Sequence, residues 1–195
     1  MSHLYPPLSS ARAGLRKWAA WFSSSGEKRT YCPDRDAHFF SDLLRAPTTS
    51  GTSAFIVTDA GLVKAGLAKK VTDVLDSAKI PYFLYDQVVA NPTAELIDRG
   101  AAKLKETPDA VVVTLGGGSS MDAGKAIATL AKQEETAILD FCFAPGFDEE
   151  TKNLDRASLL PKKFASGAHK IIAIPTTSGT ASETNGGSVI TDSYG

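Results

Sequence analysis

Short apolar runs and segments of helical periodicity alternate along the chain from residue 53 onward. Runs rich in Val and Ile predict buried strands, and apolar residues at every third or fourth position predict helices. The predicted strands cover residues 53–58, 80–85, 109–115, 170–174 and 188–191, and the predicted helices cover residues 60–75, 94–105 and 120–132. Strands and helices in this order predict an α/β fold with a doubly wound, mostly parallel, Rossmann-like sheet.

Two of these elements carry clear boundary signals. Pro81 fits only at the beginning of its strand, where the sheet needs no backbone donor. Thr93 is a good cap for a helix that begins at Ala94. In such sheets, ligands bind beyond the carboxyl ends of the strands. We therefore expect Asp59, Asn91 and the glycine loop after the third strand to lie on one rim of the sheet.

Residues 1–50 do not follow this alternation and predict an amino-terminal extension or arm, which leaves residues 51–195 as the domain. Apolar residues from Leu8 to Phe22 have helical spacing, and the first acidic residue is Glu27. An Arg- and Ser-rich beginning with few acidic residues resembles an organelle transit peptide. A surface arm or a capping helix is the alternative. Residues 133–169 are interrupted by acidic residues, Pro and Gly, and predict a surface excursion.

Composition narrows the classes of function. The length of 195 residues predicts one domain, and 21 Lys and Arg against 22 Asp and Glu disfavour binding to nucleic acid or to an anionic membrane. The apolar runs are too short to span a bilayer. Two Cys and three scattered His give neither a disulfide scaffold nor the spacing of a metal site. We expect a cytoplasmic protein, or a mitochondrial one if residues 1–26 are a transit peptide.

Three glycines, Gly116 to Gly118, separate the third predicted strand from the next helix. They let the backbone turn sharply and approach a ligand, and the N–H groups of the following helix can bind an anion. Ser119 and Ser120 can cap that helix or donate to a phosphate oxygen. The G-x-G-x-x-G fingerprint fails at Met121, and the Walker A pattern fails at Ala126. The loop predicts a phosphate site, and a tight turn without a ligand is the alternative.

Polar residues follow two other predicted strands. Hydroxyl side chains surround one glycine between Pro175 and Glu183, and they predict a polar wall at the same rim. The same stretch also fits an N-cap series before a helix, with Glu183 closing a capping box on Thr180. Asp59 can accept both hydroxyls of an adenosine ribose and would repel a 2′-phosphate, which favours NAD over NADP. Alternatively, Asp59 caps a helix that begins at Ala60.

Four segments in this order resemble the amino-terminal, NAD-binding half of the iron-containing (group III) alcohol dehydrogenase family. They are Ile56–Asp59, Val88–Thr93, Gly116–Ala126 and Ile174–Glu183, within a match that runs from about Ala54 to Asp192. Glycerol dehydrogenase and dehydroquinate synthase are more distant relatives with a similar glycine loop. The Thr-Thr-Ser-Gly-Thr stretch favours the alcohol dehydrogenases. A glycerol dehydrogenase-like oxidoreductase and a non-catalytic nucleotide-binding or interaction fragment are the alternatives.

The resemblance implies a dehydroquinate synthase-like cofactor domain, which in the family precedes a helical domain that holds iron or zinc. It also implies hydride transfer between NAD and an alcohol or aldehyde. By resemblance, Asp59 binds the adenosine ribose and Asn91 lies on the adenosine side. The resemblance places four residues in the pyrophosphate loop and the helix behind it: Gly117, Gly118, Ser119 and Asp122. It places three in the wall beside adenine and the nicotinamide ribose: Thr176, Thr177 and Thr180.

The chain departs from the family pattern at several positions. Gly124 and Ala181 stand where the family usually has Ala and Gly, and Asn185 stands where Thr is common. The family's metal ligands, one Asp and three His, lie beyond the last residue of this chain, so we assign no catalytic or metal-binding residue. We expect these 195 residues to bind NAD weakly and not to oxidise an alcohol alone. A bare apolar cleft face would favour self-association, as a homo-oligomer or with a partner.

Overall fold

The computed structural model describes residues 19–22, 28–31, 53–134, 137–141 and 166–191. Within them, six strands form one sheet in the order β2-β1-β6-β5-β3-β4. The strands are β1 (Ala19–Phe22), β2 (Lys28–Tyr31), β3 (Ser53–Val57), β4 (Tyr82–Tyr85), β5 (Ala110–Gly116) and β6 (Ile171–Pro175). The helices are α2 (Ala60–Lys64), α3 (Leu67–Ser77), α4 (Ala94–Lys105) and α5 (Gly118–Leu130), with a 3-10 helix, η1 (Ile138–Phe141).

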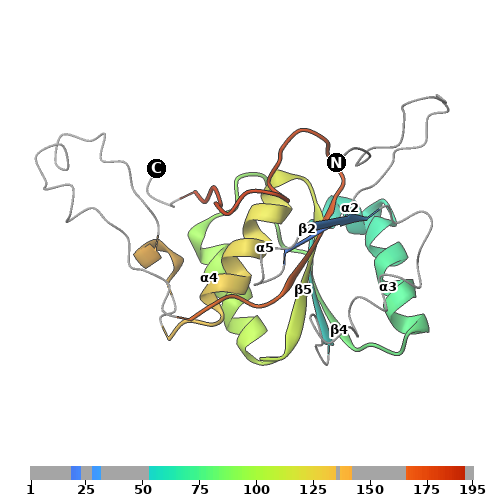
Figure 1. Ribbon diagram of the computed structural model, residues 1–195, viewed down its shortest axis with the longest axis horizontal. Coiled ribbons are helices and arrows are strands. Elements are labelled where there is room, and N and C mark those ends of the chain that lie inside the picture. The colour runs from blue at the N-terminus through green and yellow to red at the C-terminus, as the bar shows by residue number, and fades with distance from the viewer. Residues whose placement is uncertain (1–18, 23–27, 32–52, 135–136, 142–165, 192–195) are drawn as a thin grey trace, which may run out of the picture.

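Helices cover both faces of the sheet. Strands β6, β5, β3 and β4 run parallel, whereas β1 is antiparallel to both β6 and β2. Helices α2 and α3 lie on one face, and α4 and α5 lie on the other (Figure 1). The chain steps from β3 to β4 in one direction and from β4 to β5 and β6 in the other, and right-handed crossovers place these helices on opposite faces. The predicted doubly wound α/β fold is confirmed.

Side chains of the two central strands alternate between two hydrophobic cores. Phe55 of β3 and Val112 of β5 lie in the core under α4 and α5. Ile56, Val111 and Val113 lie in the core under α3. All residues of β5 are buried, as expected for a parallel strand that is covered on both faces. This packing fixes the carboxyl ends of β3 and β5 side by side at one rim of the sheet.

Helix α4 has the bounds that the sequence predicts. The Oγ1 atom of Thr93 accepts a hydrogen bond from the N–H group of Leu96 at 3.4 Å, as a helix cap does. The hydroxyl group of Tyr85, at the end of β4, donates to the carbonyl oxygen of Leu96 at 2.7 Å. Burial raises the pKa of Tyr85, which keeps this hydroxyl protonated as a donor. The first turn of α4 is therefore fixed to the end of β4.

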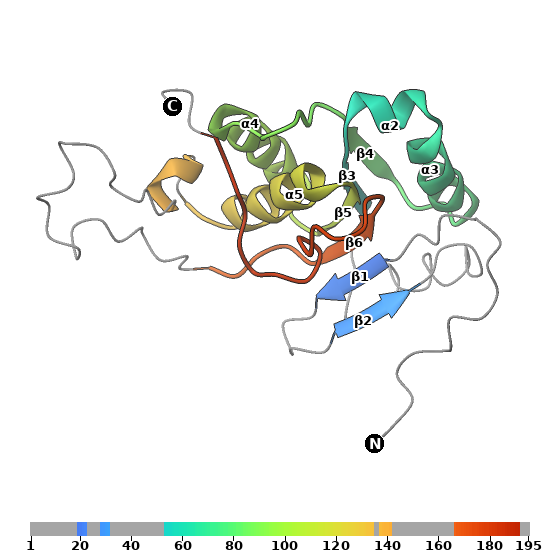
Figure 2. The ribbon, with the colours of Figure 1, turned by 90° about the horizontal axis from the view of Figure 1, so that it is seen from above.

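Two short strands lie within the predicted extension of residues 1–50. Strand β1 pairs with β6, and β2 pairs with β1 at the edge of the sheet (Figure 2). The helical spacing that reaches Phe22 is therefore wrong for residues 19–22, because backbone pairing with β6 makes them a strand. Residues 1–18 lie outside the described part of the chain. The division of the chain at residue 50 stays a prediction.

Three further predictions of elements are wrong. The helix predicted over residues 60–75 is two helices, because Gly66 has a φ of +73° between α2 and α3. Residues 188–191 do not form a strand, and only Thr191 makes an isolated parallel bridge, with Thr93. The segment 133–169 is not only a surface excursion, since Ile138 and His169 are buried in its described part. The segment 133–169 has few and widely spaced apolar positions, so its sequence shows no periodicity from which this burial could be predicted.

Candidate functional site

The carboxyl ends of β3 and β5 form a switch point in the sheet. The chain leaves β3 toward β4 and leaves β5 toward β6, so these two connections run in opposite directions from neighbouring strands. Such a point leaves a crevice in which ligands bind. A pocket of about 450 Å³ opens there. Its lining residues are Asp59, Ala60, Gly61, Val88, Val89, Ala90, Gly117, Gly118, Ser119 and Ser120.

The N-terminus of α5 forms one wall of this pocket. Gly116 ends β5 with a φ of +150°, a conformation that favours glycine, and a Cβ there would collide with the side chain of Ser120. Gly117 is the N-cap residue, and no side chain caps the helix. Ser119 and Ser120 lie inside the first turn, so the prediction that one of them caps α5 is wrong. The first N–H groups of a helix have no partner within the helix, and here they lie beside the pocket.

Asp59 lies across the pocket, two residues after the end of β3. Its Oδ1 atom accepts a hydrogen bond from the N–H group of Leu62 at 3.0 Å, and Asp59 is the N-cap residue of α2. The predicted capping role is therefore confirmed. A Cβ on Gly61 would lie 2.9 Å from the same Oδ1 atom, so glycine at this position leaves space for the carboxylate. One face of the pocket consequently carries a fixed negative charge, and the opposite face carries the positive end of α5.

Residues 176–184, which we call the hydroxyl loop, follow β6 and lie beside the glycines. The N–H group of Thr176 donates to the carbonyl oxygen of Gly116 at 2.8 Å, which continues the β5–β6 pairing past the end of β6. A Cβ on Gly117 would lie 3.2 Å from the Oγ1 atom of Thr177. The glycine loop and the hydroxyl loop are therefore in close contact, although about sixty positions separate them in the sequence.

The middle of the hydroxyl loop packs against Gly118. A Cβ on Gly118 would lie 3.3 Å from the Oγ atom of Ser182 and 3.5 Å from the Cβ atom of Thr180. The predicted helix after Thr180 does not form, because Ala181 has a φ of +56° and turns the chain. Thr180 Oγ1 accepts from the N–H group of Ser182 at 3.4 Å, so the capping box with Glu183 is wrong. Thr176, Thr177 and Thr180 are not among the residues that line the pocket, and the polar wall stays a prediction.

Asn91 contacts the first turn of α5 and Asp122 lies within α5, and neither residue lines the pocket. The N–H group of Asn91, an exposed residue with a φ of +55°, donates to the Oγ atom of Ser119 at 3.4 Å. The Oδ2 atom of Asp122 accepts from the N–H group of Val189 at 3.0 Å, and Oδ1 lies 3.0 Å from Nζ of Lys125. Both oxygens of Asp122 therefore contact groups outside the pocket. Its assignment to the pyrophosphate loop stays a prediction.

The described residues contain no group of three or more His, Cys, Asp or Glu that could hold a metal ion. His169 is the only histidine among them, and it lies at the other end of the sheet, where its Nδ1 atom is 3.0 Å from the carbonyl oxygen of Ala110 at the beginning of β5. Within the same part of the chain, we find no helix with the length and apolarity needed to cross a membrane.

The sequence model for iron-containing alcohol dehydrogenases matches residues 37–195, which is most of the chain. This chain belongs to the iron-containing alcohol dehydrogenase family. Lactaldehyde reductase of Escherichia coli (strain K12) is 35% identical to it over 139 residues, which cover 71% of this chain and 32% of that enzyme. The chain thus spans about a third of the length of this curated relative.

Two solved structures of iron-containing alcohol dehydrogenases and their relatives have the same fold. The archaeal halo-thermophilic alcohol dehydrogenase from a Red Sea brine pool has 31% identity and a TM-score of 0.64, covering 80% of this chain and 37% of that one. Sulfoacetaldehyde reductase from Bifidobacterium kashiwanohense, solved in complex with NAD+, has 26% identity and a TM-score of 0.59. That match covers 76% of this chain and 34% of the reductase.

Several residues of the site were not predicted from the sequence of this family member, and only some of them had a signal in it. Val88 to Ala90 line the pocket, and they belong to one of the four segments that carry the family resemblance. That membership was a signal that could have identified them. Gly61 had no such signal, because its role depends on the carboxylate of Asp59 folding back over it. The contact of Lys125 with the strap was also missed, because Asn185 and Gly187 lie about sixty residues away along the chain.

Proposed function

We propose that this chain is the NAD-binding portion of an NAD-dependent alcohol dehydrogenase. The observation that carries the proposal is the uncapped N-terminus of α5, which forms a wall of the pocket at the switch point. N–H groups at such a terminus bind the diphosphate of a dinucleotide, and the absence of side chains on Gly117 and Gly118 lets the hydroxyl loop pack beside this terminus. The hydroxyl group of Ser119 lines the same pocket and is placed to donate to a phosphate oxygen.

The carboxylate of Asp59 supports NAD as the cofactor. One of its oxygens accepts from the N–H group of Leu62, and this leaves the second oxygen for the hydroxyls of an adenosine ribose. A 2′-phosphate in the same place would meet this negative charge, which supports NAD over NADP. In the proposal, Asn91 lies on the adenosine side. Thr176, Thr177 and Thr180 would form the wall beside adenine and the nicotinamide ribose, and Asp122 would support the pyrophosphate loop from the helix.

The proposed reaction is hydride transfer between NAD and an alcohol or aldehyde. NAD, when bound, supplies the hydride acceptor, while the residues of this chain bind the diphosphate, orient the ribose and keep the cofactor extended along the switch point. The family name implies iron, and the resemblance implies Fe²⁺ or Zn²⁺. No cluster among the residues that the structure describes fits such an ion, so we assign no step to a metal. The proposal that the substrate is a small alcohol or aldehyde is based only on the relatives.

We also propose the cell compartment and the assembly of the protein. A net charge of −1 supports a protein that binds neither nucleic acid nor an anionic membrane surface. The cytoplasm is the proposed compartment, with the mitochondrion as the alternative if residues 1–26 are a transit peptide. We propose self-association through the cleft face, and sedimentation at several protein concentrations tests it, because a single monomeric species at all of them would contradict the proposal.

Calorimetric titration of the chain with NAD and with NADP tests the proposed function. Asp59→Asn is the decisive variant, because Asn caps a helix about as well as Asp but carries no charge. We expect NAD to bind to the wild-type chain, and we expect its preference over NADP to fall about tenfold in the variant, which corresponds to about 1.4 kcal/mol. No heat with either nucleotide at millimolar concentration would refute the cofactor assignment. An unchanged preference in a folded Asp59→Asn protein would refute the role of the carboxylate.

A further inference from the structure

Residues 185–191, which we call the strap, cross the outside of α5 and end beside α4 (Figure 2). Residues 184–189 are all exposed, and Val189 is 75% exposed, so apart from Ile190, which packs against the core under α4 and α5, little apolar burial holds this segment. At its far end, the N–H group of Thr191 donates to the carbonyl oxygen of Pro92 at 2.9 Å, and its own carbonyl oxygen accepts from Ala94. Segments with so little buried surface open easily unless polar contacts fix them.

Two side chains of α5 supply such contacts at the near end of the strap. The Nζ atom of Lys125 donates to the Oδ1 atom of Asn185 at 2.8 Å and to the carbonyl oxygen of Gly187. Asp122 accepts from the N–H group of Val189 through Oδ2, and its Oδ1 atom lies 3.0 Å from Nζ of Lys125. The side chains of Lys125 and Asp122 are only 12% and 11% exposed. Removal of one charge would therefore leave the other buried without its partner, which is strongly unfavourable.

The strap continues directly into the hydroxyl loop. The N–H group of Asn185 donates to the carbonyl oxygen of Ala181 at 3.1 Å. Ala181 holds a φ of +56°, a conformation that is unfavourable for a non-glycine residue and persists only where neighbouring contacts impose it. Thr180 and Ser182, on either side of Ala181, are the residues that pack against Gly118. A contact that fixes Asn185 therefore also fixes the part of the loop beside the glycines.

We propose that Asp122 and Lys125 are positioning residues that hold the strap and, through Asn185, keep the hydroxyl loop against Gly118. The proposal deepens the proposed function and rests on it, because the loop so held would form one wall of the NAD site. Lys125 contacts Asn185, which is sixty residues away along the chain, and Lys125 is not among the residues that line the pocket. Its effect on cofactor binding is consequently indirect.

Lys125→Met tests the proposal, because Met keeps the length of the side chain and removes its charge and donors. We expect the amides of Gly187 and Val189 to exchange with deuterium about tenfold faster or more, as the strap opens. We expect the Kd for NAD to rise about fivefold or more, the lower end of a typical coupling between linked sites. Lys125→Arg keeps the charge and donors, and we expect it to restore both properties in large part.

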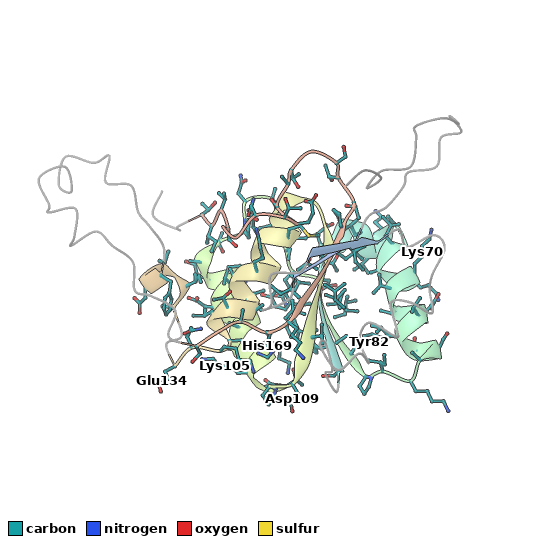
Figure 3. The ribbon with its side chains drawn as sticks, in the orientation of Figure 1. Lys70, Tyr82, Lys105, Asp109, Glu134 and His169 are labelled. Carbon is teal, nitrogen blue, oxygen red and sulfur yellow. The ribbon has the colours of Figure 1, made fainter. Side chains whose placement is uncertain are left out.

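Two further variants complete the test. Asn185→Ala changes an exposed residue and leaves the ion pair of Lys125 and Asp122 intact. It removes the Oδ1 atom that accepts from Lys125 and from the N–H group of Gly187, so in this variant the exchange of the Val189 amide, and not that of Gly187, reports on the strap. We expect it to weaken NAD binding even if Lys125→Met fails to fold. Lys70→Met removes an exposed lysine of α3 on the other face of the sheet (Figure 3) and serves as the matched charge control, with no effect on either readout.

The possible outcomes are distinct. Unchanged amide exchange in both Lys125→Met and Asn185→Ala would overturn the clamp, by which we mean the contacts of Asp122 and Lys125 that hold the strap. Faster exchange with an unchanged Kd for NAD would overturn the positioning role and leave a merely structural contact. If the wild-type chain binds no NAD, the proposed function and the positioning role both fail, whereas exchange rates still decide whether the clamp exists.

Discussion

The methyl group of Thr114 occupies the space that a side chain on Gly124 would need. A Cβ added to Gly124 would overlap Cγ2 of Thr114, and the Cβ atom of Thr114 would be 3.2 Å away. Thr114 is 1% exposed, and its hydroxyl group donates to the sulfur of Met121 at 3.1 Å. Helix α5 therefore approaches β5 closely at this point, which explains why the alanine that is usual in the family is absent here.

Gly124→Ala should destabilise the chain by about 1–3 kcal/mol, because the added methyl group overpacks a buried contact. This loss would occur although Ala is the better helix former by about 1 kcal/mol. Thr114→Ser removes only the clashing methyl group and keeps the hydroxyl. The double variant should therefore be more stable than Gly124→Ala alone, as measured by urea unfolding. If the losses in unfolding free energy of the two single variants simply add in the double variant, the contact with Thr114 is not what excludes a side chain at position 124.

Ala181→Gly should stabilise the chain by up to about 1 kcal/mol. Glycine adopts a positive φ without the steric penalty that alanine has, although it loses more entropy on folding. Thermal unfolding measures the change. Ala65→Gly is the matched control, because Ala65 is exposed and has a φ of −74°, so the same substitution there should destabilise. A loss of stability in Ala181→Gly as large as in the control would contradict the strain at residue 181.

Burial lowers the pKa of His169 below its ordinary value of 6.5. The unfolded chain then takes up a proton at a higher pH than the folded chain does. The contribution of neutral His169 to stability is present above pH 6.5 and is lost as the pH falls from 6.5 through the lower folded-state pKa. His169 and Asp109 lie at the end of the sheet where β5 begins, away from the cofactor pocket (Figure 3). We expect a loss of stability on acidification without a local change in the pocket.

His169→Asn isolates this contribution, because Asn keeps a donor for the carbonyl oxygen of Ala110 and does not titrate. Unfolding free energies at about pH 7.5 and pH 5 measure the effect. The wild-type chain should lose more stability between these values than the variant. Asp98, whose pKa burial raises, titrates in both proteins, so the difference between them reports on His169. An equal loss in both proteins would exclude His169 as its source.

Asp59→Ala should destabilise the chain by about 1 kcal/mol through the loss of the α2 cap. Asp59→Asn should keep the stability within a few tenths of a kcal/mol, since Asn accepts from the same N–H group of Leu62. Comparison of the two variants by urea unfolding separates the structural role of residue 59 from its proposed role with the ribose. Equal stability of the Ala and Asn variants would mean that the side chain does not cap α2.

Elements with strong local signals were predictable from the sequence. Helix α4 has a cap at Thr93 and an apolar face with regular spacing, and β5 is an almost continuous run of Val and Leu. The break between α2 and α3 also had a local signal, Gly66, but the apolar period continues on both sides of it and conceals the break. Helix η1 had no such signal, because only tertiary packing against α4 buries Ile138 and Phe141.

The sequence by itself determined the α/β class, the position of the glycine loop and the family, because periodicity, caps and runs of glycine are local properties of the chain. Only the tertiary structure decided which loops meet at the switch point, because strand order brings residues 59–61 and 117–120 to one pocket. It also decided why Gly124 replaces alanine and why Lys125 reaches Asn185. Those relationships depend on distances between segments that are far apart along the chain, and no local pattern contains them.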